Sequence, residues 1–320
     1  MKRRYLYVMD PLESINPYTD STFYLMLEAK NRDIENLVCH LNDLVISDGK
    51  GFAHVTSVDV FIPAFDGAPY YQTKHRETVS FDDCNVIWMR KDPPFDENYL
   101  TATFLLDCHN PSYTKVMNHP MGLRAANEKL WGLAKIPHLM PRTVVSANPQ
   151  VLHESAQHFG KAVLKPLFNS GGAGVMVFDR HDKNLHSAID LLTHEGKRQA
   201  LVQEYLQGAR HGDKRLILLG GKPVGAFTRV PQEDDHRANL HIGGQAKKAR
   251  ITLQDEQLAE ALSPHLLQLG LHFVGLDIIE GKITEINVTS PTGLQEIDRF
   301  DGRAGKERLN SQILDYVEQI

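Results

Sequence analysis

The sequence predicts an α/β fold. In its first third, a short apolar strand, an amphipathic helix and a second apolar strand follow one another, an order typical of α/β domains with ligand-binding loops at the strand ends. In the rest of the chain, strand-like segments alternate with glycine-rich turns. The length of 320 residues allows two or three domains, and 42% hydrophobic with 23% charged residues is typical of a globular protein.

Composition argues against several classes of protein. The 35 Lys+Arg and 40 Asp+Glu residues give a formal net charge of −5, so the chain lacks the basic footprint of nucleic-acid or membrane-surface binding. Its three cysteines, Cys39, Cys84 and Cys108, are widely spaced, which argues against a disulfide framework or a zinc site and fits a reducing cytoplasm. The apolar run after the basic start ends at Asp10, too early for a signal peptide or membrane helix. We expect a cytoplasmic protein that binds neither nucleic acid nor membranes.

The N-terminal elements follow from local signals. Residues 5–9 form a first strand, which ends at Asp10-Pro11 because proline cannot continue a hydrogen-bonded ladder. Asp20 is a capping residue for a helix over residues 21–30, and residues 86–89 form another strand. Residues 118–122 are rich in turn formers and mark a boundary, after which we expect a helix containing residues 127–131.

A glycine loop lies between two predicted strands, residues 162–165 and 175–178. Lys165 ends the first strand, and Gly171 and Gly172 follow about six residues later. Small residues let backbone N–H groups approach an anion, and the lysine adds a compact positive charge for phosphate. The loop is neither a Walker A motif nor a Rossmann fingerprint, because a strand follows it. A plain hairpin loop is the alternative, since Asn-Ser-Gly-Gly is also good turn chemistry.

A predicted hairpin over residues 273–289 carries acidic side chains on one face. Period-two alternation places its apolar residues on one face, and Asp277, Glu285 and Asn287 on the other. A three-residue loop at 280–282 would set Asp277 opposite Glu285, where the two carboxylates need a counter-charge. Carboxylate and amide oxygens suit Mg²⁺ better than zinc. A solvated polar face is the alternative.

Two arginines lie at neighbouring strand ends. Arg215 begins one predicted strand and Arg229 ends the strand paired with it, a placement that suits an anionic intermediate, although a surface ion pair is the commoner fate of an arginine. The polar segment 230–244 that follows ends in two glycines, and we expect it to form a lid over the substrate.

Several motifs together resemble the bacterial glutathione synthetases, a family of ATP-grasp ligases. The resemblance runs in one order from about Met9 to Thr292. The most specific runs are Arg-Lys-Asp-Pro-Pro-Phe-Asp at 90–96 and Glu-Ile-Asn-Val-Thr-Ser-Pro-Thr at 285–292. The resemblance implies an ATP-grasp fold with an N-terminal α/β pre-ATP-grasp domain. It divides the chain into a substrate domain at 1–122, a central subdomain at 123–200 and a catalytic subdomain at 201–320.

The resemblance also implies the reaction: ATP, γ-glutamylcysteine and glycine give glutathione, ADP and phosphate through an acyl phosphate. The cofactors are then ATP and Mg²⁺, with Mn²⁺ as an alternative, and the family implies a homo-oligomer. The implied roles are: catalytic, Arg215 and Arg229; ATP-binding, Lys129, Lys165, Gly171, Gly172, Glu204, Tyr205, Leu206 and Asp213; metal-binding, Asp277, Glu285 and Asn287; substrate-binding, Asp10, Arg90, Asp92, Arg237, Asn239, Ser290, Pro291, Thr292 and Gly293.

The chain departs from the family pattern in loops that cover the substrate. Phe168 stands where family members usually carry an acid, Ala238 replaces a glycine of the lid, and Gly293 stands where a cysteine or similar residue is common. Two alternatives to glutathione synthesis therefore stay open. One is a related ATP-grasp ligase acting on a different peptide-like carboxylate or amine, and the other is an inactive nucleotide-binding homologue.

Overall fold

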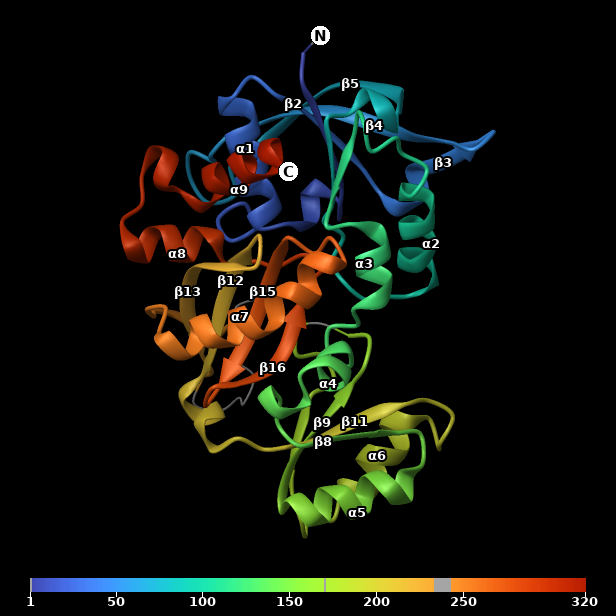
Figure 1. Ribbon diagram of the computed structural model, residues 1–320, viewed down its shortest axis with the longest axis vertical. Coiled ribbons are helices and arrows are strands. Elements are labelled where there is room, and N and C mark those ends of the chain that lie inside the picture. Colours follow the sequence, from blue (N-terminus) through green and yellow to red (C-terminus); the bar gives the residue numbers. More distant parts are fainter. Residues whose placement is uncertain (1, 170, 233–242) are drawn as a thin grey trace.

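The computed structural model describes residues 2–169, 171–232 and 243–320. Three sheets follow one another along the long axis of the molecule (Figure 1). The N-terminal sheet lies at one end, near both chain termini, the C-terminal sheet lies in the middle, and a small four-stranded sheet lies at the other end. This architecture confirms the predicted α/β class.

The N-terminal sheet has seven strands in the order β3-β4-β2-β1-β6-β7, with β5 paired to β4. β1 pairs in parallel with β2 and β6. It is the first predicted strand, and it begins and ends one residue earlier than expected. Asp20 caps α1 as predicted, because its carboxylate accepts a 2.7 Å hydrogen bond from the Phe23 amide. The elements are β1 Arg4–Val8, α1 Ser21–Asn31, β2 Glu35–Cys39, β3 Leu44–Ser47, β4 Lys50–Val60, β5 Tyr71–Ser80, β6 Val86–Met89, α2 Glu97–Leu106, β7 Lys115–Met117 and α3 Pro120–Ala125.

Alternation along β1 gives this sheet two buried faces. Tyr5 and Tyr7 pack with α1 and the C-terminal helix α9 (Leu309–Gln319), whereas Leu6 and Val8 pack with α2 and α3. Both apolar clusters continue into the C-terminal sheet, so the two sheets share their cores. Because both faces are covered, the strand ends are left as the places where polar ligands can approach.

The small sheet is antiparallel, in the order β10-β9-β11-β8. Its apolar side chains pack with α5 and α6 in a separate cluster that includes Leu152, Leu164 and Ile189. The glycine loop connects β9 to β10, as predicted. The elements of this region are α4 Trp131–Lys135, β8 Thr143–Ser146, α5 Pro149–Phe159, β9 Lys161–Pro166, β10 Met176–Asp179, α6 Leu185–Thr193 and β11 Ala200–Glu204.

The C-terminal sheet is antiparallel, in the order β14-β13-β12-β15-β16. The apolar face of α7 packs on one side of it, and residues of α8 and α9 pack on the other. The elements are β12 Asp213–Leu219, β13 Lys222–Val230, β14 Gln245–Lys248, α7 Leu253–Gln268, β15 Phe273–Ile279, β16 Lys282–Asn287 and α8 Leu294–Asp301. Of the helices in the described residues, none has the length and apolar composition needed to cross a bilayer.

Two local predictions around residue 120 were wrong. Residues 120–122 are helical rather than a turn, because Pro120 occupies the first turn of α3, where its missing N–H costs nothing. The helix expected at 127–131 begins only at Trp131. Asn127 instead folds residues 127–130 into a turn, since its side-chain oxygen accepts from the amides of Lys129 and Leu130.

Candidate active site

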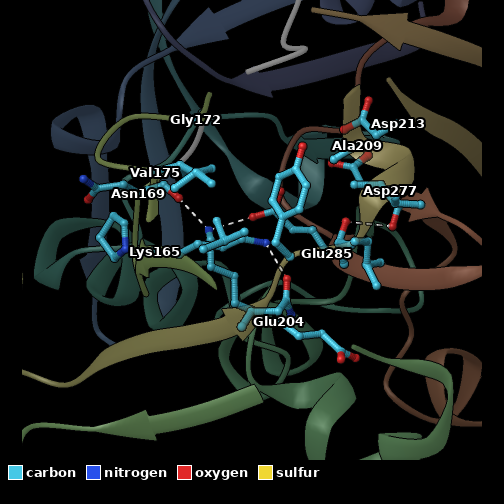
Figure 2. A pocket seen from close by; sticks show the side chains of 18 of the residues that line it. Lys165, Asn169, Gly172, Val175, Glu204, Ala209, Asp213, Asp277 and Glu285 are labelled. Atoms are coloured by element: carbon cyan, nitrogen blue, oxygen red, sulfur yellow. Dashed lines mark hydrogen bonds and ion pairs between the residues drawn. The ribbon is translucent and has the colours of Figure 1, made fainter. Parts of the chain in front are cut away.

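A pocket lies between the small sheet and the C-terminal sheet. It encloses about 990 Å³, counting the part open to solvent, which is the size of a ligand site. In Figure 2, Lys165, Asn169, Gly172 and Val175 lie on one side of it, and Asp213, Asp277 and Glu285 lie on the other. The pocket brings together most of the residues predicted for nucleotide and metal, with one of the two predicted catalytic arginines, Arg229: Lys129, Lys165, Gly172, Glu204, Tyr205, Leu206, Asp213, Asp277 and Glu285.

Two lysine ammonium groups reach into this pocket. Lys129 Nζ is 2.7 Å from Glu285 Oε1 and donates to the carbonyl of Asn169 at 2.7 Å. Burial alone would lower the pKa of Lys129, but the Glu285 carboxylate outweighs it and the pKa is raised. Lys165 Nζ donates to Gln203 Oε1 at 2.8 Å, and burial lowers its pKa. Both ammonium groups therefore offer positive charge to a polyphosphate bound in this pocket.

The wall between the sheets is apolar, which the sequence analysis did not anticipate. Val163, Val175 and Val177 come from the glycine-loop hairpin, and Ile279 faces the pocket from β15. Period-two alternation of valines along the hairpin was the signal that could have found this wall. Segment 204–206 lies at its edge, and the Glu204 carboxylate there accepts from the Arg142 amide at 2.8 Å and from its Nε at 2.6 Å. Such a slot can hold a flat aromatic ring.

The acidic hairpin has the predicted pairing but a different loop. Asp277 pairs directly with Glu285, whereas Ile279 pairs with Lys282, so the turn has two residues and not three. Glu280 and Gly281 have φ values of 50° and 72°, as expected for the tight turn that suits a twisted hairpin. A bulge after Asp277 restores the register, because Ile278 pairs with Ile283 and Thr284 is the extra residue. Both acids therefore share a face.

The counter-charges of these acids form a buried network. Arg215 Nε is 2.6 Å from Asp277 Oδ1, and Arg229 Nη2 is 2.8 Å from Asp277 Oδ2. Arg229 also binds Asp213: its Nε donates to Oδ1 at 2.7 Å and its Nη2 donates to Oδ2 at 2.5 Å. Both arginines are 5% exposed, so they are not surface ion pairs.

Charge, not burial, determines the ionisation of Asp277. Burial would raise the pKa of Asp277, but the guanidinium groups of Arg215 and Arg229 hold it below its ordinary value. Burial raises the pKa of Asp213, against the opposing effect of Arg229. Asp213, predicted to contact nucleotide, thus lies in the pocket wall with its carboxylate bound to Arg229. Asp277 offers a fixed negative charge at neutral pH.

The donor set fits Mg²⁺ if phosphate oxygens complete it. Asp277, Glu285 and Asn287 all supply oxygen, and the Asn287 amide nitrogen donates to the Gly275 carbonyl at 3.3 Å, which leaves its oxygen for a ligand. Among the described residues, no three His, Cys, Asp or Glu side chains gather closely enough to hold a metal ion by themselves. Magnesium commonly binds through one or two carboxylates together with substrate phosphates, so this arrangement suits a metal–nucleotide complex.

A second pocket, of about 780 Å³, adjoins the first. Arg229 and Glu285 line both pockets, and Gly171 of the glycine loop lines the second. The predicted substrate residues Asp92, Ser290, Thr292 and Gly293 line it as well, and Asp92 accepts a hydrogen bond from the hydroxyl of Ser290.

Other predicted substrate residues lie behind this pocket or outside the description. Asp10 accepts from the Asp92 amide at 3.0 Å. Arg90 is 4% exposed and donates to the carbonyl of Pro291 at 2.9 Å, so it holds the 290–293 loop from behind. Arg237 and Asn239, with most of the predicted lid, lie outside the described residues. The two ends of that segment meet where Gln232 Nε2 donates to the Gly243 carbonyl at 2.9 Å.

Gly293, a departure from the family pattern, has a structural reason. Its φ is 114°, a conformation that side chains disfavour, and a Cβ there would lie 2.3 Å from the ring of Phe227. Phe227 itself is buried in the core beneath the second pocket and lines it. The buried ring therefore occupies the volume that a side chain at position 293 would need.

Comparison with known proteins agrees with this geometry. Residues 4–124 match the model of the prokaryotic glutathione synthetase N-terminal domain, and residues 128–302 match that of the prokaryotic glutathione synthetase ATP-grasp domain. A glutathione synthetase of Thermosynechococcus vestitus is 39% identical over 97% of this chain and 98% of its own. One of Brucella melitensis is 39% identical over 92% of this chain and 93% of its own.

Solved structures show the same fold at lower identity. The crystal structure of D-cycloserine synthetase DcsG superposes with a TM-score of 0.66 at 17% identity, over 98% of this chain and 99% of that one. The ATP-grasp ligase PsnB, complexed with minimal precursor, Mg and ADP, superposes with a TM-score of 0.59 at 14% identity, over 98% of both chains. With both domain models matched in order along nearly the whole chain, the protein belongs to the prokaryotic glutathione synthetase family of ATP-grasp ligases.

Proposed function

We propose that this chain performs the family's reaction, the ATP-dependent joining of γ-glutamylcysteine to glycine, at the boundary between its two pockets. The observation that carries the proposal is that Arg229 and Glu285 line both pockets. A nucleotide in the first and a peptide in the second would meet at these two side chains. Reactive groups held at such a boundary gain rate from proximity and orientation alone.

The first pocket would bind ATP. Its apolar slot beside segment 204–206 suits adenine, and Lys129 and Lys165 suit the phosphates. Asp277, Glu285 and Asn287 would hold Mg²⁺, or Mn²⁺ in its place, together with phosphate oxygens. When bound, the metal would spread the charge that develops on the transferring phosphoryl group.

The chemistry needs no nucleophilic side chain. The C-terminal carboxylate of γ-glutamylcysteine attacks the γ-phosphorus of ATP, which breaks the bond to ADP and gives an acyl phosphate. The glycine amine then attacks the acyl carbon, phosphate leaves with its electron pair, and the amine loses a proton. Arg215 and Arg229, fixed by Asp277 and Asp213, would stabilise the acyl phosphate and the tetrahedral oxyanion.

The substrate pair is tested by measuring ADP release over γ-glutamyl dipeptides crossed with amine acceptors. Release that requires both γ-glutamylcysteine and glycine, with one peptide formed per ADP, is the expected result. Phe168, which is 51% exposed at the base of the glycine loop, favours a second candidate in which another carboxylate or amine is joined. A different productive pair would support that candidate, and no productive pair would mean that the chain only binds nucleotide.

We also propose a domain division, an oligomeric state and a location for this chain. The chain divides at about residues 122 and 200; the first boundary separates the N-terminal sheet from the small sheet, whereas the second falls at β11, a strand of the small sheet. It works as a homo-oligomer, which light scattering of the purified protein would check. A cytoplasmic location is supported by its three cysteines, all of which are free thiols.

A further inference from the structure

Glu128 lies between the two pockets without an assigned role. It lines the second pocket beside Glu285 and Asn287, and its neighbour Lys129 reaches into the first. Its Oε1 accepts three hydrogen bonds: from the Val288 amide at 2.9 Å, the Thr289 amide at 3.1 Å and the Thr289 hydroxyl at 2.9 Å. Its own carbonyl accepts a fourth, from the Ile286 amide at 2.9 Å.

These four bonds attach Glu128 to the outer edge of β16. β16 is the last strand of its sheet, so β15 satisfies its backbone on one side only. Alternate amides of an edge strand point outward and need other partners. Glu128 supplies them to Ile286 and to Val288, the residues on either side of Asn287.

The same turn also fixes Glu285. Lys129 Nζ holds Glu285 Oε1 at 2.7 Å, while Asn127 Oδ1 accepts from the Lys129 amide at 3.1 Å and so fixes the turn from which Lys129 projects. Glu285 and Asn287 are thus positioned by one short turn through consecutive residues. Within their own hairpin Glu285 pairs with Asp277 and Asn287 with Gly275, but the bulge after Asp277 interrupts the ladder beside Glu285.

We propose that Glu128 is a positioning residue that fixes the edge of β16 so that Glu285 and Asn287 present their oxygens to a divalent cation. The inference rests on the proposed metal site. Glu128 acts through hydrogen-bond acceptance, since its Oε1 accepts from three donors that belong to the backbone and side chain of 288–289.

The test is the binding of Mn²⁺ to the full-length protein in the presence of ADP, with free Mn²⁺ measured by electron paramagnetic resonance. Glu128→Ala removes the acceptor, and we expect the Mn²⁺ concentration at half-saturation to rise by about 10-fold or more, as for other partners that orient metal ligands. Glu128→Gln keeps an oxygen acceptor of the same reach without the charge, and should stay within about threefold of the parent protein.

Two further measurements separate positioning from general loss of structure. Hydrogen exchange should accelerate in peptides spanning residues 286–289 of Glu128→Ala, and not in peptides from β15. Asp298 is a matched control, since its carboxylate accepts from the Leu309 amide and the Tyr24 hydroxyl on another side of the sheet. Asp298→Ala should lower the Tm without changing Mn²⁺ binding. If Glu128→Ala does not fold, Glu128→Asp, shorter by one methylene, should still weaken Mn²⁺ binding.

Parent-like Mn²⁺ affinity in Glu128→Ala or Glu128→Asp would overturn the proposal. So would a loss in Glu128→Gln as large as in Glu128→Ala, because the charge would then matter and not the acceptor. Measuring Glu285→Gln in the same assay distinguishes a failure of the proposed metal site from a failure of the positioning role. If Glu285→Gln binds Mn²⁺ normally, the metal site itself is wrong; if it loses binding while Glu128→Ala does not, only the positioning role fails.

Discussion

Replacing Arg229 with lysine should slow turnover far more than it weakens substrate binding. Arg229 forms two parallel bonds to Asp213, at 2.7 and 2.5 Å, and a third to Asp277 at 2.8 Å. Lysine keeps the positive charge but cannot form the planar fork, so the cation would no longer be fixed between the two pockets. Losing one fixed donor to a developing oxyanion costs about 2.7 kcal/mol, and kcat should therefore fall by about 10²-fold.

The assay is steady-state ADP release with γ-glutamylcysteine and glycine varied in turn. Arg303→Lys is the control, since Arg303 also pairs with an acid, Asp301 at 3.0 Å, but lies away from both pockets. It should leave kcat and KM unchanged. Breaking a buried ion pair generally costs about 3–5 kcal/mol, which is a large part of the free energy of unfolding of many domains. The Tm of each variant is therefore measured first. A folded Arg229→Lys enzyme whose KM alone changes would refute the role in the transition state.

Three other predictions follow from the same geometry. Glu285→Gln should remove most turnover while circular dichroism stays unchanged, and near-normal activity in limiting magnesium would contradict the metal assignment. Burial lowers the pKa of Lys165 from 10.5, so ATP affinity should fall as the pH rises through that lowered pKa, and ATP binding near that pH should take up a proton. Calorimetry in buffers of different ionisation enthalpy measures the proton uptake, which Lys165→Arg should abolish. Gly293→Ala should destabilise the fold by about 1–3 kcal/mol in denaturant unfolding, because of its φ of 114° and its clash with Phe227, and Phe227→Leu should recover part of that loss.

Local patterns were sufficient to predict the acidic face of the hairpin, but not its turn. Alternation placed Asp277, Glu285 and Asn287 on one side, and a pattern of period two survives in any correctly paired ladder. The predicted loop length was wrong, and the predicted face was right only because two errors cancelled. A two-residue turn would have put the acids on opposite faces, and the extra residue Thr284 in the bulge puts them back. A bulge of this kind leaves no distinct mark in a single sequence.

The partners of the charged residues could not be predicted, because they depend on which strands become neighbours. Arg215 lies opposite Asp277 only because β12 pairs with β15, 62 residues later in the chain. The same holds for Glu128, whose acceptor role exists only where its turn meets the edge of β16, 160 residues away. Residues 127–131 were predicted to be helical, and no role was predicted for Glu128. Its position next to a functional lysine was the one signal available.

The charges around the nucleotide pocket also predict the order in which ligands bind. Among the described residues, three acids of the pocket already have cationic partners: Asp213 binds Arg229, Asp277 binds Arg215 and Arg229, and Glu285 binds Lys129. Lys165 donates instead to the neutral side chain of Gln203. A divalent cation alone would have to compete with these cations for the carboxylates, whereas ADP supplies phosphate oxygens both to Lys165 and to the metal.

We therefore expect Mg²⁺ alone to raise the Tm by less than about 1 °C at concentrations where ADP and Mg²⁺ together stabilise strongly. A ligand present at 100 times its Kd contributes about 2.7 kcal/mol of stability, which is several degrees for a protein of this size. Thermal unfolding with ADP alone, Mg²⁺ alone and both, at an ionic strength kept constant with NaCl, measures the coupling. The shift with both ligands should exceed the sum of the separate shifts. An equal shift with Mg²⁺ alone would show that Asp277 and Glu285 form a cation site without the nucleotide, and the charge argument would fail.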